Sequence, residues 1–419
     1  MGTSLLPSKT LATDGTVSGM VPPELPVEIK VGLLTGGYDK PYVFGLALAL
    51  AARTVCIDVI GSDDIDSREM HTTPRLNFLN LRGSKQEAGL AVKMARVLFY
   101  YARLCRYAAV AQAKILHILW NNKFEFIDRT LLMLYYKLLG KKIVFTAHNV
   151  NAGKRDSTDS LLNRITLRVQ YLLADHIFVH TEKMKSELIQ EFGVKEKNVS
   201  VIPFGINNAV PHTNLSTREA KMRLGIRSDE KTILFFGAIR PYKGLEYLVS
   251  AFQQLAATHP EYRLIIAGEP RKESQQYSDE IRRTIDGHAS RKQVLQKFQY
   301  IPDEETELYF KGADVLALPY THVFQSGVLF LGYSFGLPMV GAEVGSIREE
   351  VIEGCTGFLC APCDSNDLAR AIEKYFESDL FRNLDSRRQV IRDYANAKHS
   401  WDIVGETTRD VYKQLLSAR

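Results

Sequence analysis

The chain has 419 residues, a formal net charge of +5, and a composition of 45% hydrophobic and 24% charged residues. This composition excludes a disordered or fibrous chain, and the length exceeds what one hydrophobic core normally supports, which predicts two domains. The mild charge, without a recognisable reading helix or basic clusters among exposed aromatics, indicates that nucleic acid is not a partner.

The first 27 residues are predicted to form a flexible tail, because they lack the basic start and continuous apolar core of a secretory signal. No uninterrupted apolar run reaches the roughly 18 residues of a membrane-spanning helix. The five cysteines are too few for a disulfide scaffold and favour a reduced compartment. We therefore expect a cytoplasmic protein, with peripheral contact at the inner face of the membrane as the alternative.

Short β-rich runs alternate with helical stretches from residue 28 to residue 205. This alternation is typical of a doubly wound parallel sheet with helices on both faces. It predicts a first Rossmann-like domain over residues 28–207. The runs are 28–35, 55–61, 76–81, 115–120, 142–148, 176–181 and 199–205.

A polar interval interrupts the alternation near residue 208, and the pattern then restarts. It predicts a second Rossmann-like domain over 208–399, followed by an amphipathic helix in 400–419. Because open α/β sheets bind ligands beyond the carboxyl ends of their strands, two such domains facing each other form a cleft. The second set of runs is 232–237, 263–268, 314–319 and 338–343.

Two glycine-bearing turns in the second domain suit a diphosphate. The first, F-G-A-I-R-P-Y-K-G from Phe236 to Gly244, follows a strand and supplies Gly237, Arg240 and Lys243. The second, Q-S-G-V-L-F-L from Gln325, opens a helix. Glycine allows close backbone approach, a helix N-terminus presents unpaired N–H groups, and the two cations add charge. Together the turns predict a sugar-nucleotide site, whereas either alone also suits an ordinary strand-to-helix turn.

An ordered set of further motifs makes the chain resemble a known family. H-T-E-K-M-K-S-E-L (180–188) leads to V-I-P-F-G-I-N (201–207), then to G-x-x-x-x-x-K-G ending at Gly244, and finally to A-D-V-L-A-L-P, G-L-P-M-V and V-G-S-I-R-E-E-V. This order resembles the GT-B fold glycosyltransferases, and most closely the retaining, nucleotide-sugar-dependent family 4.

The resemblance implies a role for each candidate site residue. It places the nucleotide in the second domain, with Lys243 on the diphosphate, and the acceptor in the first. It also implies that the helix in 400–419 packs back on the first domain. Arg240 substitutes for an arginine that family members commonly carry where this chain has Ala238. The implied catalytic residues are His148, Lys243 and Arg240, and the implied donor-binding residues are Gly36, Gly37, Gly237, Gln325, Ser326, Gly327 and Val328.

The chain departs from the family at Val323 and Leu331, where two glutamates that contact the sugar and the ribose usually stand. The expected function is a retaining transfer of a hexose from a nucleoside diphosphate sugar to a saccharide or lipid-linked acceptor in polysaccharide or glycolipid biosynthesis. No cofactor and no metal is expected. Because the glutamates are missing, a non-catalytic nucleotide-sugar-binding partner subunit is the alternative, and an epimerase or phosphorylase on the same architecture is a third.

Several weaker signals leave two interpretations open. His148 at a strand end is either a site residue or a hydrogen-bonded core histidine. Asp64 and Asp66, in D-I-D, are a metal pair or solvated loop acids. Glu349 and Glu350 are ligand contacts or helix-start acids. A face of the helix predicted between Ala88 and Lys114 contacts anionic lipid or water; this face carries Lys93, Arg96, Tyr100, Arg103 and Tyr107.

Overall fold

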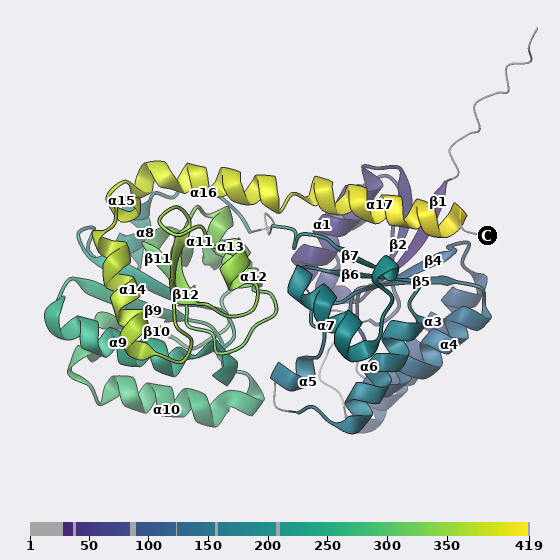
Figure 1. Cartoon of the computed structure of the whole chain (residues 1–419), viewed down its shortest axis with the longest axis horizontal. Helices are drawn as coiled ribbons and strands as arrows, with labels where there is room; N and C mark the ends of the chain where they lie inside the picture. Colours follow the sequence, from purple (N-terminus) through teal and green to yellow (C-terminus); the bar gives the residue numbers. More distant parts are fainter. Residues whose placement is uncertain are drawn as a thin grey trace, which may run out of the picture.

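The computed structural model describes residues 28–36, 39–83, 89–122, 124–155, 158–206 and 210–417. Two α/β domains lie side by side, each with a parallel sheet between layers of helices (Figure 1). The expected tail over 1–27 and the expected domain boundary near residue 208 fall outside the described residues.

The first sheet has seven parallel strands in the order β3-β2-β1-β4-β5-β6-β7. Its central strands are apolar without alternation because helices cover both faces. The strand order reverses between β1 and β4, so their carboxyl ends mark the point where such sheets bind ligands. The strands are β1 Ile29–Leu34, β2 Val55–Gly61, β3 Leu76–Asn80, β4 Ile115–Ile118, β5 Lys142–Thr146, β6 His176–Val179 and β7 Val199–Val201.

Two hydrophobic clusters occupy the two faces of the first sheet. One contains buried side chains of α3, α4, α6 and α7, and the other those of α1 and the C-terminal helix α17. The helices of this domain are α1 Lys40–Ala51, η1 Asp63–Ile65, α2 Arg68–Thr72, α3 Leu90–Val110, η2 Ile127–Leu132, α4 Met133–Leu138, α5 Ala152–Arg155, α6 Leu161–Leu173, α7 Glu182–Phe192 and η3 Glu196–Asn198.

The tyrosines and the cations of the predicted α3 face separate, which agrees with the interpretation of a solvated face whose tyrosines cover the edge of the core, while contact of the cations with lipid stays a prediction. Tyr100 is buried and donates to Asn122 Oδ1 at 2.7 Å, and Tyr107 donates to Asp58 Oδ2 at 2.8 Å. Lys93 and Arg103 are exposed. The tyrosines therefore belong to the core side of α3.

The second sheet has six parallel strands in the order β10-β9-β8-β11-β12-β13, with its reversal between β8 and β11. The sequence did not predict β10 or β13. The strands are β8 Lys231–Phe236, β9 Tyr262–Ala267, β10 Val294–Lys297, β11 Val315–Leu318, β12 Met339–Ala342 and β13 Gly357–Cys360. The helices are α8 Thr217–Arg223, η4 Pro241–Lys243, α9 Leu245–Thr258, η5 Lys272–Ser274, α10 Gln275–Asp286, η6 Ala289–Gln293, α11 Asp303–Gly312, α12 Gly327–Ser334, α13 Ile347–Glu350, α14 Ser365–Glu377, α15 Asp379–Arg382 and α16 Leu384–Lys398.

The last helix, α17 Trp401–Ser417, crosses from the second domain to the first, where it lies along α1 (Figure 1). Small residues allow this approach: a Cβ at Gly45 would lie 2.1 Å from the Trp401 ring. The Trp401 indole donates to the Ile206 carbonyl at 2.9 Å. Tyr412 of α17 is buried in the first domain's core.

The two passages of the chain between the domains are bonded to each other. The Ile206 N–H donates to the His399 carbonyl at 3.0 Å, and His399 Nδ1 lies 3.0 Å from the Phe204 carbonyl. Within the described ranges, no helix has both the length and the apolar character that a membrane crossing requires.

Candidate active site

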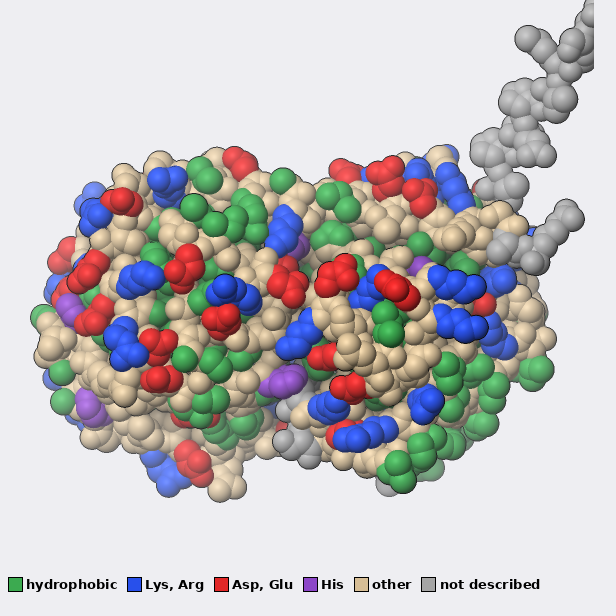
Figure 2. Space-filling model, viewed as in Figure 1, with side chains coloured by type: hydrophobic (Ala, Val, Ile, Leu, Met, Phe, Trp, Pro, Cys, Tyr) green, Lys and Arg blue, Asp and Glu red, His purple; other side chains and the backbone are tan. Residues whose placement is uncertain are grey.

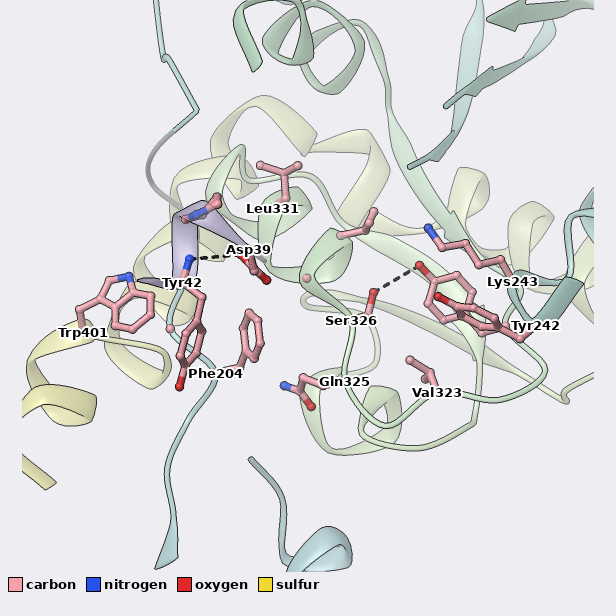
Figure 3. Close-up of a pocket in the computed structure, with 15 residues that line it drawn as sticks. Asp39, Tyr42, Phe204, Tyr242, Lys243, Val323, Gln325, Ser326, Leu331 and Trp401 are labelled. Atoms are coloured by element: carbon pink, nitrogen blue, oxygen red, sulfur yellow. Dashed lines mark hydrogen bonds between the residues drawn. The ribbon is translucent and has the colours of Figure 1, made fainter. Parts of the chain in front are cut away.

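A cavity of about 280 Å³ lies between the domains, beyond the carboxyl ends of β1, β8 and β11 (Figure 3). Both sheets reverse their strand order at these positions, so the cavity joins the two points where the folds favour ligands. The first domain contributes Asp39, Pro41, Tyr42, Phe204, Gly205 and, on α17, Trp401; the second contributes Tyr242, Lys243, Tyr320, Val323, Gln325, Ser326, Gly327, Val328 and Leu331.

Two glycines shape the loop that carries Lys243. Gly237 ends β8 with φ 95°, and Gly244 links η4 to α9 with φ 64°. A Cβ at Gly244 would lie 2.0 Å from the Pro319 carbonyl oxygen. No other residue fits at Gly244 without moving the backbone of the segment after β11. The packing of this loop therefore fixes the position of Lys243.

Lys243 is buried and has no carboxylate partner among the described residues. Its side chain is 6% exposed, and its Nζ lies 3.4 Å from the Phe236 carbonyl oxygen. Burial first, and then the nearby cations Arg240 and Arg271, lower the pKa of Lys243 to about 7. A bound anion would favour the charged form of this amine.

Arg240 does not line the cavity. It is partly buried, and its guanidinium lies 3.6 Å from Glu273. It acts on the site through its charge, since it is one of the two cations that lower the pKa of Lys243. The sequence prediction of a direct contact with the ligand therefore stays a prediction.

The N-terminus of α12 opens into the cavity beside Lys243: a Cβ at Gly237 would lie 3.0 Å from Lys243 Nζ and 3.3 Å from Val328 Cγ2 (Figure 3). Ser326 is the N-cap residue, and its hydroxyl accepts from the Leu329 N–H at 3.3 Å. The first backbone amides of the helix, at Gly327 and Val328, lie at the lining and suit an anion or a sugar oxygen. Within the described part of the chain, neither Gln325 Oε1 nor Gln325 Nε2 has a hydrogen-bond partner although both are buried.

Val323 and Leu331, which stand where the family has glutamates, both line the cavity. Both are nearly buried, with 6% and 8% exposed. A Cβ at Gly345 would lie 1.7 Å from the Val323 carbonyl oxygen, so the loop of Val323 is closely packed. The wall of the cavity at these two positions is apolar, and neither side chain can accept a hydrogen bond.

His148 lies behind the cavity wall. Its ring stacks on Trp120, with centroids 4.1 Å apart, and contacts the edge of Tyr42 at 4.6 Å. Tyr42 lines the cavity, whereas His148 does not. Gly36 is also outside the lining: it has φ 60°, and a Cβ there would lie 2.8 Å from the Trp120 carbonyl oxygen. Gly37 lies outside the described residues.

Hydrogen bonding favours one tautomer for His148. His180 Nδ1 lies 3.2 Å from the Ile202 carbonyl, which only accepts, so Nδ1 of His180 carries a proton. Burial lowers the pKa of both histidines, that of His180 to about 4, so both are neutral at pH 7. His180 Nε2 then accepts from His148 Nδ1–H at 3.0 Å. This leaves a lone pair on the buried His148 Nε2, which has no partner in the described structure.

The sequence interpretation missed Asp39, whose carboxylate lines the cavity. Asp39 is the N-cap of α1 and adopts the left-handed conformation, with φ 45° and ψ 69°. Its Oδ1 accepts from the Tyr42 N–H at 3.2 Å. Burial raises the pKa of Asp39, and the Tyr42 N–H partly offsets this. The sequence signal was D-K-P before a helix, which is also an ordinary helix start.

One residue of each acidic pair singled out in the sequence, Glu350 and Asp66, has a partner within the protein. Glu350 accepts from Lys398 at 2.8 Å and lies 2.9 Å from His399 Nε2, so it ties α13 to the end of α16. Asp66 lies 2.7 Å from His71 Nε2. Among the described residues, no group of three or more His, Cys, Asp or Glu side chains could hold a metal ion.

Both domains match known protein families. The second domain matches the model of glycosyl transferases group 1 over residues 216–397, and the first matches Glycosyltransferase Family 4 over residues 41–210. A D-inositol 3-phosphate glycosyltransferase of Corynebacterium aurimucosum is 24% identical over 283 residues, which are 66% of this chain and 66% of that relative. The match thus spans just under two thirds of the relative's own length.

Two solved structures share the fold. The sucrose-phosphate synthase of Thermosynechococcus elongatus has a TM-score of 0.75 at 19% identity and covers 93% of this chain and 100% of its own. HepE of Anabaena, in complex with UDP and glucose, has a TM-score of 0.72 at 16% identity, with 92% and 100% covered. These likenesses and the two facing domains define a GT-B protein, which confirms the predicted architecture.

The particular family follows from the two model matches, which together cover most of both domains. The chain belongs to the GT-B glycosyltransferases of the family 4 type.

Proposed function

We propose that the protein transfers a hexose from a nucleoside diphosphate sugar to a saccharide or lipid-linked acceptor with retention of configuration. The observation that carries this proposal is the buried amine of Lys243, which lacks a carboxylate partner among the described residues and lines the same cavity as the N-terminus of α12. Such an arrangement stabilises negative charge that develops on a departing diphosphate.

The donor is proposed to bind mainly to the second domain. Lys243 and the amides of Gly327 and Val328 would hold the diphosphate, while Ser326 and Gln325 offer hydroxyl and amide groups to the sugar. Support for a uridine nucleotide comes from the solved HepE structures, one of which contains UDP and glucose and another UDP-glucose. Gly36, Gly37, Gly237 and Arg240 are proposed to shape this donor site from its margin.

The chemical step needs charge stabilisation more than a metal. An acceptor hydroxyl oxygen forms a bond to the anomeric carbon on the face from which the diphosphate leaves, the bond from that carbon to the diphosphate oxygen breaks, and a base in the cavity takes up the hydroxyl proton. The diphosphate leaves with the bonding electrons, and Lys243, aided by the charge of Arg240, neutralises it. His148 would fix Tyr42 and the sugar-facing wall, and as a neutral ring it is not a cation at this step. We expect activity to be unchanged by a chelator.

The acceptor is proposed to bind to the first domain. Saccharides and lipid-linked sugars are both candidates, and inositol phosphate is a third because the relative from Corynebacterium aurimucosum carries that name. Polysaccharide or glycolipid biosynthesis is the corresponding process. A location at the cytoplasmic face of the membrane goes with a lipid-linked acceptor.

A non-catalytic sugar-nucleotide-binding subunit is the rival function, and the apolar wall at Val323 and Leu331 favours it. One experiment separates the two. Purified protein is incubated with UDP-glucose, UDP-N-acetylglucosamine, GDP-mannose or ADP-glucose and with saccharide, inositol 3-phosphate and lipid-linked acceptors. Nucleoside diphosphate release and product mass are followed, and proton NMR gives the anomeric configuration.

If the donor's bond from the anomeric carbon to the diphosphate is axial and the new glycosidic bond is also axial, the result supports the proposal. A product with the opposite anomeric configuration contradicts retention but leaves the proposed hexose transfer standing. Binding of a nucleotide sugar in calorimetry without release under any pairing supports the subunit. Failure of every nucleotide sugar to bind overturns both functions.

A further inference from the structure

One side of the first domain carries an unusual amount of exposed apolar surface. We call it the apolar face, and it lies on α3, on the segment 124–139 that contains η2 and α4, and on α6. Figure 2 shows hydrophobic side chains gathered where Figure 1 places these helices. The apolar face consists of Val92, Met94, Leu98, Phe99, Val110, Phe124, Phe126, Ile127, Leu131, Leu134, Leu138, Leu139, Leu161, Leu162, Ile165 and Leu172.

The rest of the described chain exposes few comparable side chains, namely Met222, Tyr300, Ile352, Val390 and Ile403. On the apolar face Leu138 is 87% exposed, Leu161 76% and Leu98 69%. Exposed apolar surface on this scale marks an interaction site in a protein that is otherwise well packed.

The helices of the apolar face are held rigidly against one another. Tyr101 of α3 donates to Asp128 of η2 at 2.9 Å, and Tyr135 of α4 donates to the Cys105 carbonyl of α3 at 3.1 Å. The arrangement is therefore a preformed surface of the domain.

The charged residues around the apolar face indicate what kind of partner binds it. The sequences of α3 and α6 contain no Asp or Glu, but they contain Lys93, Arg96, Arg103, Arg106, Arg164 and Arg168. Arg164 pairs with Asp159 at 2.6 Å, and the exposed Glu125 of the segment 124–139 pairs with Arg129 at 2.8 Å, so the excess charge on the face is positive. A twofold dimer through this surface would bring these cations together, which costs free energy. Apolar side chains among cations suit acyl chains beneath anionic headgroups. We infer that the apolar face docks on an anionic lipid bilayer.

Vesicle binding tests this inference with the full chain and without any sugar substrate, so its outcome is independent of the proposed function. Wild-type protein is expected to sediment with phosphatidylcholine vesicles containing phosphatidylglycerol, and at least tenfold more weakly with phosphatidylcholine alone. The double variant Leu98→Ser with Phe99→Ser is expected to lose at least tenfold in binding. The matched control, Met222→Ser with Val390→Ser, alters exposed positions of the second domain and should bind as wild type.

Three results would overturn the docking inference. The first is no sedimentation of wild type with the anionic vesicles at low salt. The second is equal binding by the Leu98 and Phe99 variant. The third is a wild-type dimer in light scattering that this variant abolishes, which would assign the face to a second copy of the chain.

A second inference concerns Asp39 and rests on the proposed function. Its carboxylate is the acidic group lining the cavity within the described residues, and it stands on the acceptor domain across from Ser326 (Figure 3). One oxygen accepts from the Tyr42 N–H, and Oδ2 has no hydrogen-bond partner within the described part of the chain. A left-handed backbone at a non-glycine residue is strained, and such strain often accompanies a functional role.

We propose that Asp39 is a catalytic residue that binds the attacking hydroxyl of the acceptor and takes up its proton as the new glycosidic bond forms. The leaving diphosphate departs with its electron pair, which Lys243 stabilises, and the hydroxyl proton passes to the Asp39 carboxylate. The raised pKa of Asp39 makes its carboxylate a stronger proton acceptor than an exposed one.

The substitution Asp39→Asn tests this role, because Asn also serves as an N-cap and tolerates the left-handed conformation. With UDP-glucose and the acceptor selected by the panel above, kcat is expected to fall about a hundredfold while UDP-glucose affinity and Tm stay unchanged. Asp364→Asn is the matched control: Asp364 caps α14 by accepting from the Asn366 N–H at 2.9 Å, away from the cavity. It should retain full activity.

The pH profile supplies a second readout. The other titratable side chains lining the cavity are Lys243, Tyr42, Tyr242 and Tyr320, and none is a carboxylic acid. Wild-type kcat is therefore expected to fall in the acid range, and this limb should disappear in Asp39→Asn. Full activity of the variant, or an unchanged acid limb, overturns the role of Asp39 alone. Absence of transfer by the wild type overturns the proposed function as well.

Discussion

The two domains have the same type of fold, but they supply residues to the cavity in different ways. In the second domain, a short loop after one strand brings Lys243 into the cavity, and two glycines hold it there. In the first, the cavity wall is assembled from α1, the segment after β7 and the last helix, with His148 behind it. A local motif can identify the first kind of site, whereas the second kind depends on tertiary packing.

The largest expected effect comes from removing the Lys243 amine, the cation that the second domain supplies to the cavity. Lys243→Ala should lower kcat/KM for transfer by about 10²–10³-fold, because a preorganised charge opposite the leaving group is lost. Steady-state kinetics with the donor and acceptor chosen by the panel measure it. Arg240→Ala is the matched comparison and should lose about tenfold or less, since Arg240 does not line the cavity. Equal losses in the two variants would contradict the direct role of Lys243.

The next effect concerns the rigidity of the loop. Gly244→Ala should reduce the free energy of unfolding by about 2–4 kcal/mol, because the new Cβ meets the Pro319 carbonyl and φ is positive. Gly225→Ala is the control: its φ is 72°, but nothing lies within 4 Å of the new Cβ. It should cost about 1 kcal/mol. Urea denaturation measures both, and a Gly244→Ala variant no less stable than the control would contradict the packing argument.

A smaller effect is the pH dependence of donor binding. The pKa of Lys243 is depressed to about 7, so the free protein loses the ammonium form as pH rises through this value. A bound diphosphate favours the ammonium, so binding takes up a proton and UDP-glucose affinity should fall up to about tenfold per pH unit above 7. Calorimetry in two buffers of different ionisation enthalpy measures the uptake. Lys243→Gln should show none, and a pH-independent wild type would be inconsistent with this linkage.

The smallest expected effect concerns His148, which lies behind the cavity wall in the first domain. His148→Gln should lower kcat by about threefold to tenfold with donor affinity unchanged, because the residue positions Tyr42 from behind the wall. Kinetics and thermal shift with UDP-glucose separate the two quantities. A large loss of donor affinity would place His148 in the donor site instead.

Much of the fold was predictable from hydrophobic runs, but two strands were not. The central strands are apolar because both of their faces are buried. β10, with the sequence V-L-Q-K, is half-buried at the sheet edge and contains polar residues, and β13 is a four-residue edge strand. The Gln and Lys of β10 interrupt the continuous apolar pattern that marks a central strand.

The site was predictable to the extent that it is local. The turn of Gly237 and Lys243 and the helix start at Ser326 do line or border one cavity. Asp39 was missed because its sequence context is also that of an ordinary helix cap. The apolar face was missed because helical periodicity groups residues of α3 but does not reveal which group faces the core.

The crossing of α17 has a consequence for how the chain is made. Val404, Val411 and Tyr412 complete the hydrophobic cluster around α1 in the first domain, although they come from the last 20 residues or so. During synthesis, the N-terminal half leaves the ribosome long before these residues exist, and it must wait with one flank of its interior uncovered. Early termination near residue 400 would thus damage the half of the protein that was translated first.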